Sequence, residues 1–153
     1  MNFIENDVLK KLAVSNFNQA WQYLDKGQLS DDEKIALLQL VHASFTFWKM
    51  NTDLTVRNIS IGFWQISRAY AVMDEGNLSL LYAEKCLEVS TNESLDSFYL
   101  AYAYEAKARA LLLKGMQTDA HQCLEMAEKL IETTKETHLE GFWKDITDLK
   151  LRC

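Results

Sequence analysis

Hydrophobic residues recur along the chain at the spacing of helix faces, with short polar turns between the runs. Residues 6–26 predict a first helix, which Gly27 ends. Its main apolar positions are Leu9, Leu12, Phe17, Trp21 and Leu24. Ser30 and Glu33 fit a capping box, in which the serine accepts from a backbone N–H and the glutamate reaches back. The pattern therefore predicts a second helix from there to about Met50.

Four further helices follow from the same periodicity and from the turn residues between them. A third helix is expected from Thr52-Asp53 to Asp74 or Glu75, followed by a turn at Gly76-Asn77 and a fourth helix over residues 78–89. A polar loop over residues 91–94 leads to a fifth helix over residues 95–114, which Gly115 ends, and to a sixth over residues 117–133.

A last helix is expected after Thr137, because the run from Thr137 to Glu140 fits a second capping box. Its apolar stripe consists of Leu139, Phe142, Trp143, Ile146 and Leu149. The ends of helical arrays expose apolar surface that needs covering. We therefore expect this helix to cap the preceding hairpin.

Two segments resemble degenerate copies of one helical hairpin. The run from Gly115 to Ala120, followed by Ala127, looks like the turn and second helix of a tetratricopeptide repeat, with Ala108 as the small residue of the first helix. An earlier unit fits with its turn glycine displaced to Gly76, through Phe63, Ile66, Ser67, Tyr70, Ala83, Cys86 and Leu87. Residues 1–51 form a hairpin without such a match.

The chain also resembles a family of uncharacterised bacterial helical proteins. The matching stretches are His42-Ala43-Ser44, Trp48, the run from Trp64 to Val72 and the run from Ala101 to Ala106, within roughly residues 38–131. The resemblance implies a tetratricopeptide-like fold. Together with the helical pattern, it leads us to expect an all-α fold: an α-α superhelix of antiparallel hairpins with a C-terminal capping helix. It supplies no reaction and no catalytic residue.

Composition agrees with long helices and narrows the partners. The chain of 153 residues has no proline and five glycines, too few turn residues for an all-β protein. A formal net charge of -6 disfavours nucleic acid as a partner. No run approaches the ~20 apolar residues of a membrane span. The odd count of three cysteines suits free thiols in a cytoplasmic protein, with Cys86 and Cys123 in the core and Cys153 exposed.

Tests for enzyme and metal chemistry find no motif. The sequence has no glycine-rich phosphate loop and no His-Glu-x-x-His run. His42, His121 and His138 fall on three separate predicted helices, without paired ligand spacing. We therefore expect neither catalysis nor a metal or other cofactor.

Three isolated polar groups interrupt the most apolar helices. Arg68 is the only charged residue from Asn58 to Met73. His42 is the only ionisable group from Ala36 to Trp48, and Glu105 is the only one from Leu100 to Ala106 apart from tyrosine hydroxyls. A buried ion needs a partner, so Arg68 and Glu105 are expected to pair, with His42 a satisfied core histidine. Alternatively, the three groups line a binding cleft with the aromatic residues Trp48, Trp64, Phe98 and Tyr102. A third alternative pairs Glu105 with Arg109, one helical turn away.

These observations favour one domain over residues 1–153, with about three hairpins and a capping helix. Stacked hairpins build concave surfaces, so the expected role is a non-enzymatic module that presents a groove to a peptide or protein. The alternative is a small-molecule binder or sensor that uses the region of His42, Arg68 and Glu105. A homodimer is left open.

Overall fold

The computed structural model describes residues 4–153, and every regular element in that range is an α-helix. It contains seven helices there: α1 (Asn6–Leu24), α2 (Asp31–Met50), α3 (Val56–Val72), α4 (Gly76–Ser90), α5 (Ser97–Leu113), α6 (Gln117–Ile131) and α7 (Glu140–Lys150). The expected all-α fold class is confirmed. None of these helices is both long enough and apolar enough to cross a lipid bilayer.

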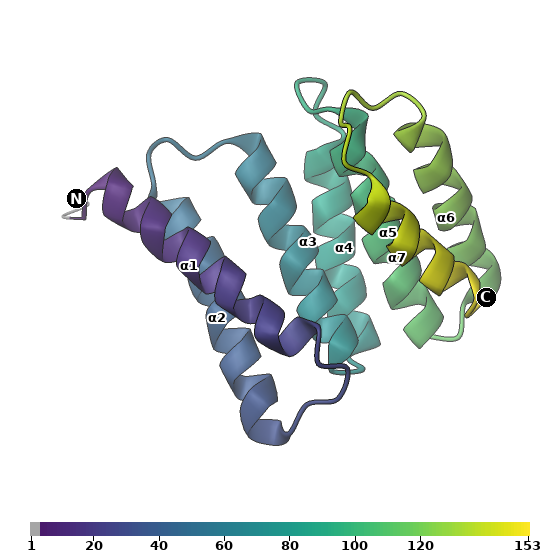
Figure 1. The fold of residues 1–153 in the computed structure, drawn as a ribbon, viewed down its shortest axis with the longest axis horizontal. Helices are drawn as coiled ribbons and strands as arrows, with labels where there is room; N and C mark the ends of the chain where they lie inside the picture. Colours follow the sequence, from purple (N-terminus) through teal and green to yellow (C-terminus); the bar gives the residue numbers. More distant parts are fainter. Residues whose placement is uncertain (1–3) are drawn as a thin grey trace.

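The first six helices form three hairpins that stack side by side. Helix α1 packs on α2, α3 on α4 and α5 on α6, and the first helices of successive hairpins also touch, α1 with α3 and α3 with α5. In Figure 1, α7 crosses in front of α5 on the same side as α1, with α3 behind and between them. We call the face built by α1, α3 and α5, with α7 lying on α5, the inner face.

Side-chain caps mark the starts of α2 and α3. Ser30 Oγ accepts from the backbone N–H of Glu33 at 3.2 Å, which confirms the predicted capping box of α2. Helix α3 begins later than predicted, because Thr55 and Asn58 form a reciprocal capping box that ends the preceding turn. The capping box predicted at Thr137 is wrong: α7 begins at Glu140, and no side chain caps it.

The turns inside the three hairpins share a left-handed residue. Gly27, Asp74 and Gly115 have φ of 83°, 62° and 75°. The turn residue of the second hairpin is therefore Asp74, and the assignment of Gly76 to that turn is wrong, since Gly76 begins α4. Aspartate tolerates this conformation better than most residues with a side chain.

The second and third hairpins are equivalent around these turns. Glu75 N donates to Tyr70 O at 2.9 Å, and Met116 N donates to Leu111 O at the same distance. Each bond closes its turn one residue after the left-handed position, so the turn features of the two units recur with an offset of 41 residues, from Asp74 to Gly115. This offset places Arg68 and Arg109 at equivalent positions of α3 and α5.

Small residues allow the paired helices to approach closely. Ser67 of α3 and Ser79 of α4 are buried and exchange hydrogen bonds with each other's backbone carbonyls, at 2.8 and 2.9 Å. The corresponding crossing of α5 and α6 is lined by the buried Ala108 and Ala120. The buried serine hydroxyls of the second hairpin therefore have hydrogen-bond partners. The third hairpin has alanine at the corresponding positions and buries no hydroxyl there.

Helix α7 covers the last hairpin, as predicted. Phe142, Ile146 and Leu149 are buried in the apolar cluster that α5 and α6 build. Trp143 departs from the predicted stripe, because it is 43% exposed. Cys86 and Cys123 are buried and Cys153 is exposed, as expected.

Candidate functional site

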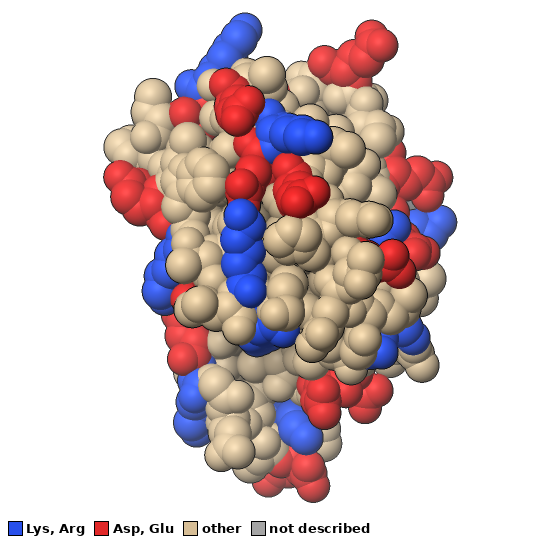
Figure 2. All heavy atoms as spheres, turned by 90° about the vertical axis from the view of Figure 1, so that its right-hand side faces the viewer, with Lys and Arg blue, Asp and Glu red and all other residues tan. Residues whose placement is uncertain are grey.

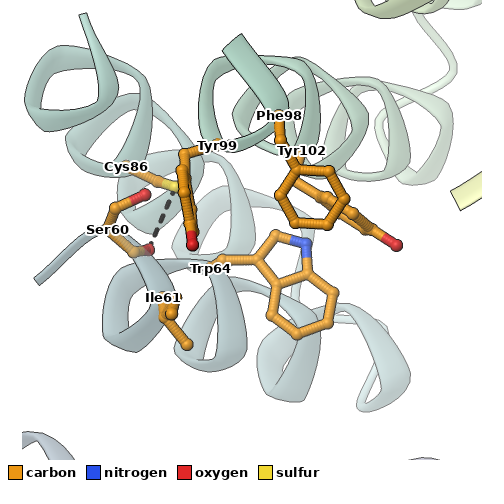
Figure 3. A pocket seen from close by; sticks show the side chains of 7 residues that line it. All are labelled: Ser60, Ile61, Trp64, Cys86, Phe98, Tyr99 and Tyr102. Atoms are coloured by element: carbon orange, nitrogen blue, oxygen red, sulfur yellow. Dashed lines mark hydrogen bonds between the residues drawn. The ribbon is translucent and has the colours of Figure 1, made fainter. Parts of the chain in front are cut away.

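A pocket lined mainly by aromatic residues opens between α3 and α5. It has a volume of about 240 Å³ and is half-open to solvent. Seven residues line this aromatic pocket: Ser60, Ile61 and Trp64 from α3, Cys86 from α4, and Phe98, Tyr99 and Tyr102 from α5. Figure 3 shows the rings of α5 facing Ile61 and Trp64 across the opening, with Ser60 and Cys86 at one end.

The polar atoms at the end of the pocket are already paired. Ser60 Oγ shares a hydrogen bond of 2.7 Å with Ser90 Oγ, and the Cys86 thiol donates to the carbonyl of Ser60 at 3.3 Å (Figure 3). Burial raises the pKa of the Cys86 thiol to about 11. The thiol is therefore protonated at neutral pH and is no nucleophile.

The aromatic walls hold one another in edge-to-face contacts. The ring centroids of Trp64 and Tyr102 lie 5.5 Å apart at 82°, and those of Phe98 and Tyr102 lie 5.0 Å apart at 67°. Tyr102 also meets Phe142 of α7, with centroids 5.3 Å apart. Such contacts add to the stability that burial gives, so these walls are fixed by three helices.

Trp64 also links the pocket to a set of one buried and three half-buried charges, which we call the charged cluster: Glu105, Arg68, Arg109 and Asp145. Glu105 has no exposed surface. Its Oε2 accepts from Trp64 Nε1 at 3.0 Å, and its Oε1 accepts from Arg109 Nε at 3.2 Å and from Arg109 Nη2. The carboxylate therefore has partners on both oxygens, as a buried charge requires.

The expected pairing of Arg68 with Glu105 is wrong. Arg68 Nη1 instead donates to Asp145 Oδ2 of α7 at 3.4 Å, while Glu105 pairs with Arg109 within its own helix. A partner one turn away along a helix is already held in place by the backbone, whereas Arg68 would have to reach across from α3. The alternative that paired Glu105 with Arg109 is confirmed.

Asp145 lies between the two equivalent arginines. Its Oδ1 is 4.0 Å from Arg109 Nη2, and its Oδ2 takes the bond from Arg68. Burial raises the pKa of the Asp145 carboxyl, Glu105 adds to the rise, and the two arginines oppose it. Burial alone would lower the pKa of Arg109, but Glu105 and Asp145 outweigh that effect and raise it.

Arg68 also lies against two indole rings. Its guanidinium carbon is 5.3 Å from the ring centroid of Trp21 and 5.6 Å from that of Trp64. A cation over an indole face is attracted by the electrons of the ring. Arg68 thus connects α1, α3 and α7 at the centre of the inner face.

His42 and Trp48 lie away from this region. His42 Nε2 is 3.1 Å from the hydroxyl of Tyr70, and its ring also packs on Tyr82 of α4. Tyr70 follows Arg68 by two residues, about 200° around α3, so the two side chains leave the helix on opposite sides. Trp48 is half-buried near the end of α2 and does not line the pocket. A single cleft formed by His42, Arg68 and Glu105 is therefore not present.

The structure brings together Trp64, Phe98 and Tyr102 as expected and adds residues that sequence reasoning missed. Ile61 precedes Trp64 by three residues, and Tyr99 precedes Tyr102 by three, so helical spacing could have placed both on the same faces. Asp145 had no such signal, because it lies 77 residues from Arg68 in the sequence.

The pocket offers mainly apolar surface, and the hydroxyl of Tyr99 adds a polar group to its lining (Figure 3). Its serine, thiol and indole donors are engaged with the protein itself. Among residues 4–153, no group of three or more His, Cys, Asp and Glu side chains gathers to hold a metal ion. The arrangement is suited to binding an apolar group.

Geometry is the only guide to this site. Comparison of the chain with models of known protein families, with curated proteins and with solved structures found no match.

Proposed function

We propose that this chain is a tetratricopeptide-like interaction module that binds an apolar side chain of a partner protein in the aromatic pocket. The carrying observation is the pocket itself, a half-open apolar cavity between the first helices of two adjacent hairpins. Stacked hairpins commonly bind partners on the face that their first helices build. The offset of 41 residues between Asp74 and Gly115 supports a repeat of hairpins, with extra residues compared with the roughly 34 of a tetratricopeptide repeat.

The size of the pocket favours a protein partner over a small molecule. Its volume of about 240 Å³ is below the roughly 300–1,000 Å³ of small-molecule sites. A pocket of this size accommodates one large side chain, and a single anchor that fills an aromatic pocket is typical of protein interfaces. The small-molecule alternative also depended on His42, which lies on the other side of α3.

A single anchoring side chain does not provide the affinity of a whole protein interface. Full burial of a Leu, Met or Phe side chain is worth about 1.5–3 kcal/mol, which corresponds to roughly a tenfold to hundredfold gain in affinity. The partner segment therefore needs further contacts along the inner face. Trp21, Trp64 and Arg68 are half-buried there and offer both ring faces and hydrogen-bond donors.

A selection from a random peptide library, followed by binding measurements on individual peptides, tests this proposal. The blocking variant is Ile61→Trp, which places a larger side chain at the pocket. Its matched control is Leu81→Trp, the same kind of change at a residue of α4 that is 49% exposed and lies outside the pocket. Circular dichroism establishes that both variants are folded before binding is compared.

We expect selected peptides to share an apolar residue and to lose affinity by at least about tenfold for Ile61→Trp. They should bind Leu81→Trp as they bind the original chain. Peptides that bind both variants equally well, or a library that yields no binder, would refute the proposed use of the pocket.

A further inference from the structure

The wall of the aromatic pocket is tied to α7 by a closed ring of contacts. Trp64 Nε1 donates to Glu105, Glu105 pairs with Arg109, and Arg109 approaches Asp145. From Asp145 the ring returns through Arg68, whose guanidinium lies over the Trp64 indole. Three helices that are distant in sequence therefore fix one indole group.

We propose that Asp145 is a positioning residue of the aromatic pocket. Asp145 does not line the pocket. It holds Arg68, which lies over the face of the Trp64 indole, and it approaches Arg109, which pairs with the Glu105 that accepts from the indole N–H. The part of this inference that concerns ligand affinity rests on the proposed function. The part that concerns the Trp64 indole does not.

Two different contacts restrain the Trp64 indole, and both lead back to the carboxylate of Asp145. Glu105 fixes the direction of the Trp64 N–H, and its second oxygen is engaged by Arg109. Arg68 fixes the ring face, and Asp145 is the only hydrogen-bond or ion-pair partner of its side chain within residues 4–153. Without the Asp145 carboxylate, Arg68 keeps only its two ring contacts and is free to turn toward solvent.

The surroundings of Asp145 fit a positioning role better than the role of an exposed surface charge. Its side chain is 19% exposed, as is that of Arg68, so water screens their attraction only in part. By contrast, Asp148 on the same helix is exposed and forms no hydrogen bond or ion pair to its side chain within the described residues, and it acts on Arg109 only through its charge. The two aspartates thus provide a matched pair for experiment.

The test compares Asp145→Asn with Asp148→Asn in the full chain, each of which removes one negative charge from α7. The first readout is the indole ¹H–¹⁵N signal of Trp64, assigned with Trp64→Phe. Trp48 lies away from the charged cluster and serves as an internal reference. We expect the Trp64 signal to move in Asp145→Asn and to remain in place in Asp148→Asn, with the Trp48 signal unchanged in both.

The second readout is the affinity for a peptide selected against the original chain. Asp145→Asn should weaken it by about threefold to tenfold, within the range of couplings through contact networks. Asp148→Asn should leave it unchanged. Glu105→Gln combined with Asp145→Asn should weaken binding by less than the product of the two single effects, because both act through the same indole.

An unmoved Trp64 signal in a folded Asp145→Asn protein, or equal effects of the two asparagine variants, would overturn the inference. If Asp145→Asn does not fold, Arg68→Met tests the same ring from α3 and is expected to move the Trp64 signal in the same way. If no peptide binds the original chain, the proposed function fails, while the indole signal still decides whether Asp145 positions Trp64.

Discussion

Glu105 shows how a single buried charge is tolerated in an otherwise apolar helix. Its two oxygens accept hydrogen bonds from Trp64 and Arg109, and it has no exposed surface. Bringing a carboxylate out of water is costly, so the pair contributes little net stability compared with apolar residues of similar size. Removing only one partner is strongly destabilising, because the remaining charge stays buried without a partner.

The first prediction concerns that orphaned charge. Glu105→Ala leaves Arg109 with only a distant contact to Asp145, so the free energy of unfolding should fall by about 3–5 kcal/mol. Glu105→Gln keeps an acceptor for the Trp64 N–H and should cost less. Urea denaturation followed by circular dichroism measures both, with the exposed Glu84→Ala as control. A loss for Glu105→Ala no larger than the control would show that the pair is not desolvated.

A second prediction concerns the pH dependence that His42 contributes. Burial lowers the pKa of His42 below its ordinary value of 6.5. The unfolded chain therefore takes up a proton near pH 6.5 that the folded chain binds only at lower pH. The contribution of His42 to stability is complete above pH 6.5 and is lost as pH falls through the lowered pKa.

Melting temperatures measured between pH 8 and 5 test this sign with His42→Gln, which cannot titrate. We expect the melting temperature of this variant to fall less on acidification than that of the original chain. His121→Gln is the control, because His121 is exposed on α6. An unaltered pH profile for His42→Gln would contradict the burial of the imidazole between α2, α3 and α4.

The sequence predicted the partner of a charged residue where that partner lies nearby in the chain. It did not where the partner lies on a distant helix. The isolation of Arg68 and Glu105 in apolar stretches correctly indicated groups that need partners. Helical spacing was sufficient to bring Arg109 to Glu105. Nothing in the sequence indicated that Asp145, on the last helix, lies against Arg68, because that contact depends on the docking of α7.

At the scale of elements, the contact between α2 and α3 depends on the missing side chain of Gly62. A Cβ added to Gly62 would lie 2.7 Å from Phe45 Cε2 and closer still to Cδ2. The ring of Phe45 itself packs on Phe63, with centroids 4.7 Å apart. The absence of a side chain at Gly62 therefore determines how near these helices lie.

A third prediction compares two helical glycines. Gly62→Ala forces the Phe45 ring to move, at a cost of roughly 1–3 kcal/mol, which exceeds the gain of up to ~1 kcal/mol in helix propensity. Gly141→Ala meets only Tyr102 Oη at 3.9 Å and should be neutral or stabilising. Thermal unfolding should give a lower melting temperature for the first variant and an equal or higher one for the second. The opposite order would contradict the packing of α2 on α3.

A fourth prediction concerns α7 as an integral cap. Truncation after Thr137 removes Phe142, Ile146 and Leu149, each worth about 1.5–3 kcal/mol when buried, and exposes the surface they cover. The sum is comparable to the stability of a typical domain. We expect a large fall in melting temperature and aggregation in light scattering, whereas deletion of the exposed residues 151–153 should change neither. A truncated chain that stays monomeric and equally stable would show that α7 is a free appendage.

Capping chemistry predicted one helix start and failed at another, since the box expected at Thr137 does not form. Ser30 and Glu33 placed the start of α2 correctly. The start of α3 was missed because its capping box uses Asn58 in place of glutamate. The left-handed Asp74 was missed for a similar reason, since a glycine two residues later offered a more familiar turn signal.

At the scale of the whole molecule, the stacking of hairpins leaves the inner face as the place where distant segments meet. α7 occupies the part of that face over α5 (Figure 1). The aromatic pocket lies between α3 and α5. Figure 2 shows acidic and basic side chains interspersed across the face on the right-hand side of Figure 1. That face displays no block of a single charge, so the net charge of -6 is not concentrated there.

The candidate site was predictable only in part at this scale. The aromatic residues Trp64, Phe98 and Tyr102 were correctly grouped, because helical spacing and apolar context place them on facing helices. His42 was grouped with them wrongly. A lone histidine in an apolar stretch of α2 can face either side of α3. The docking of α2 places His42 against Tyr70, on the side opposite Arg68.

The central claim is that the aromatic pocket on the inner face receives an apolar side chain of a partner. Titration of the ¹⁵N-labelled chain with a peptide from the library selection, followed by ¹H–¹⁵N NMR, tests it most directly. We predict that the largest shifts fall on the Trp64 indole and on the backbone amides of Ser60, Ile61, Tyr99 and Tyr102, and that Ile61→Trp abolishes them. Shifts confined to the outer helices α2, α4 and α6, with the pocket residues unmoved, would contradict it.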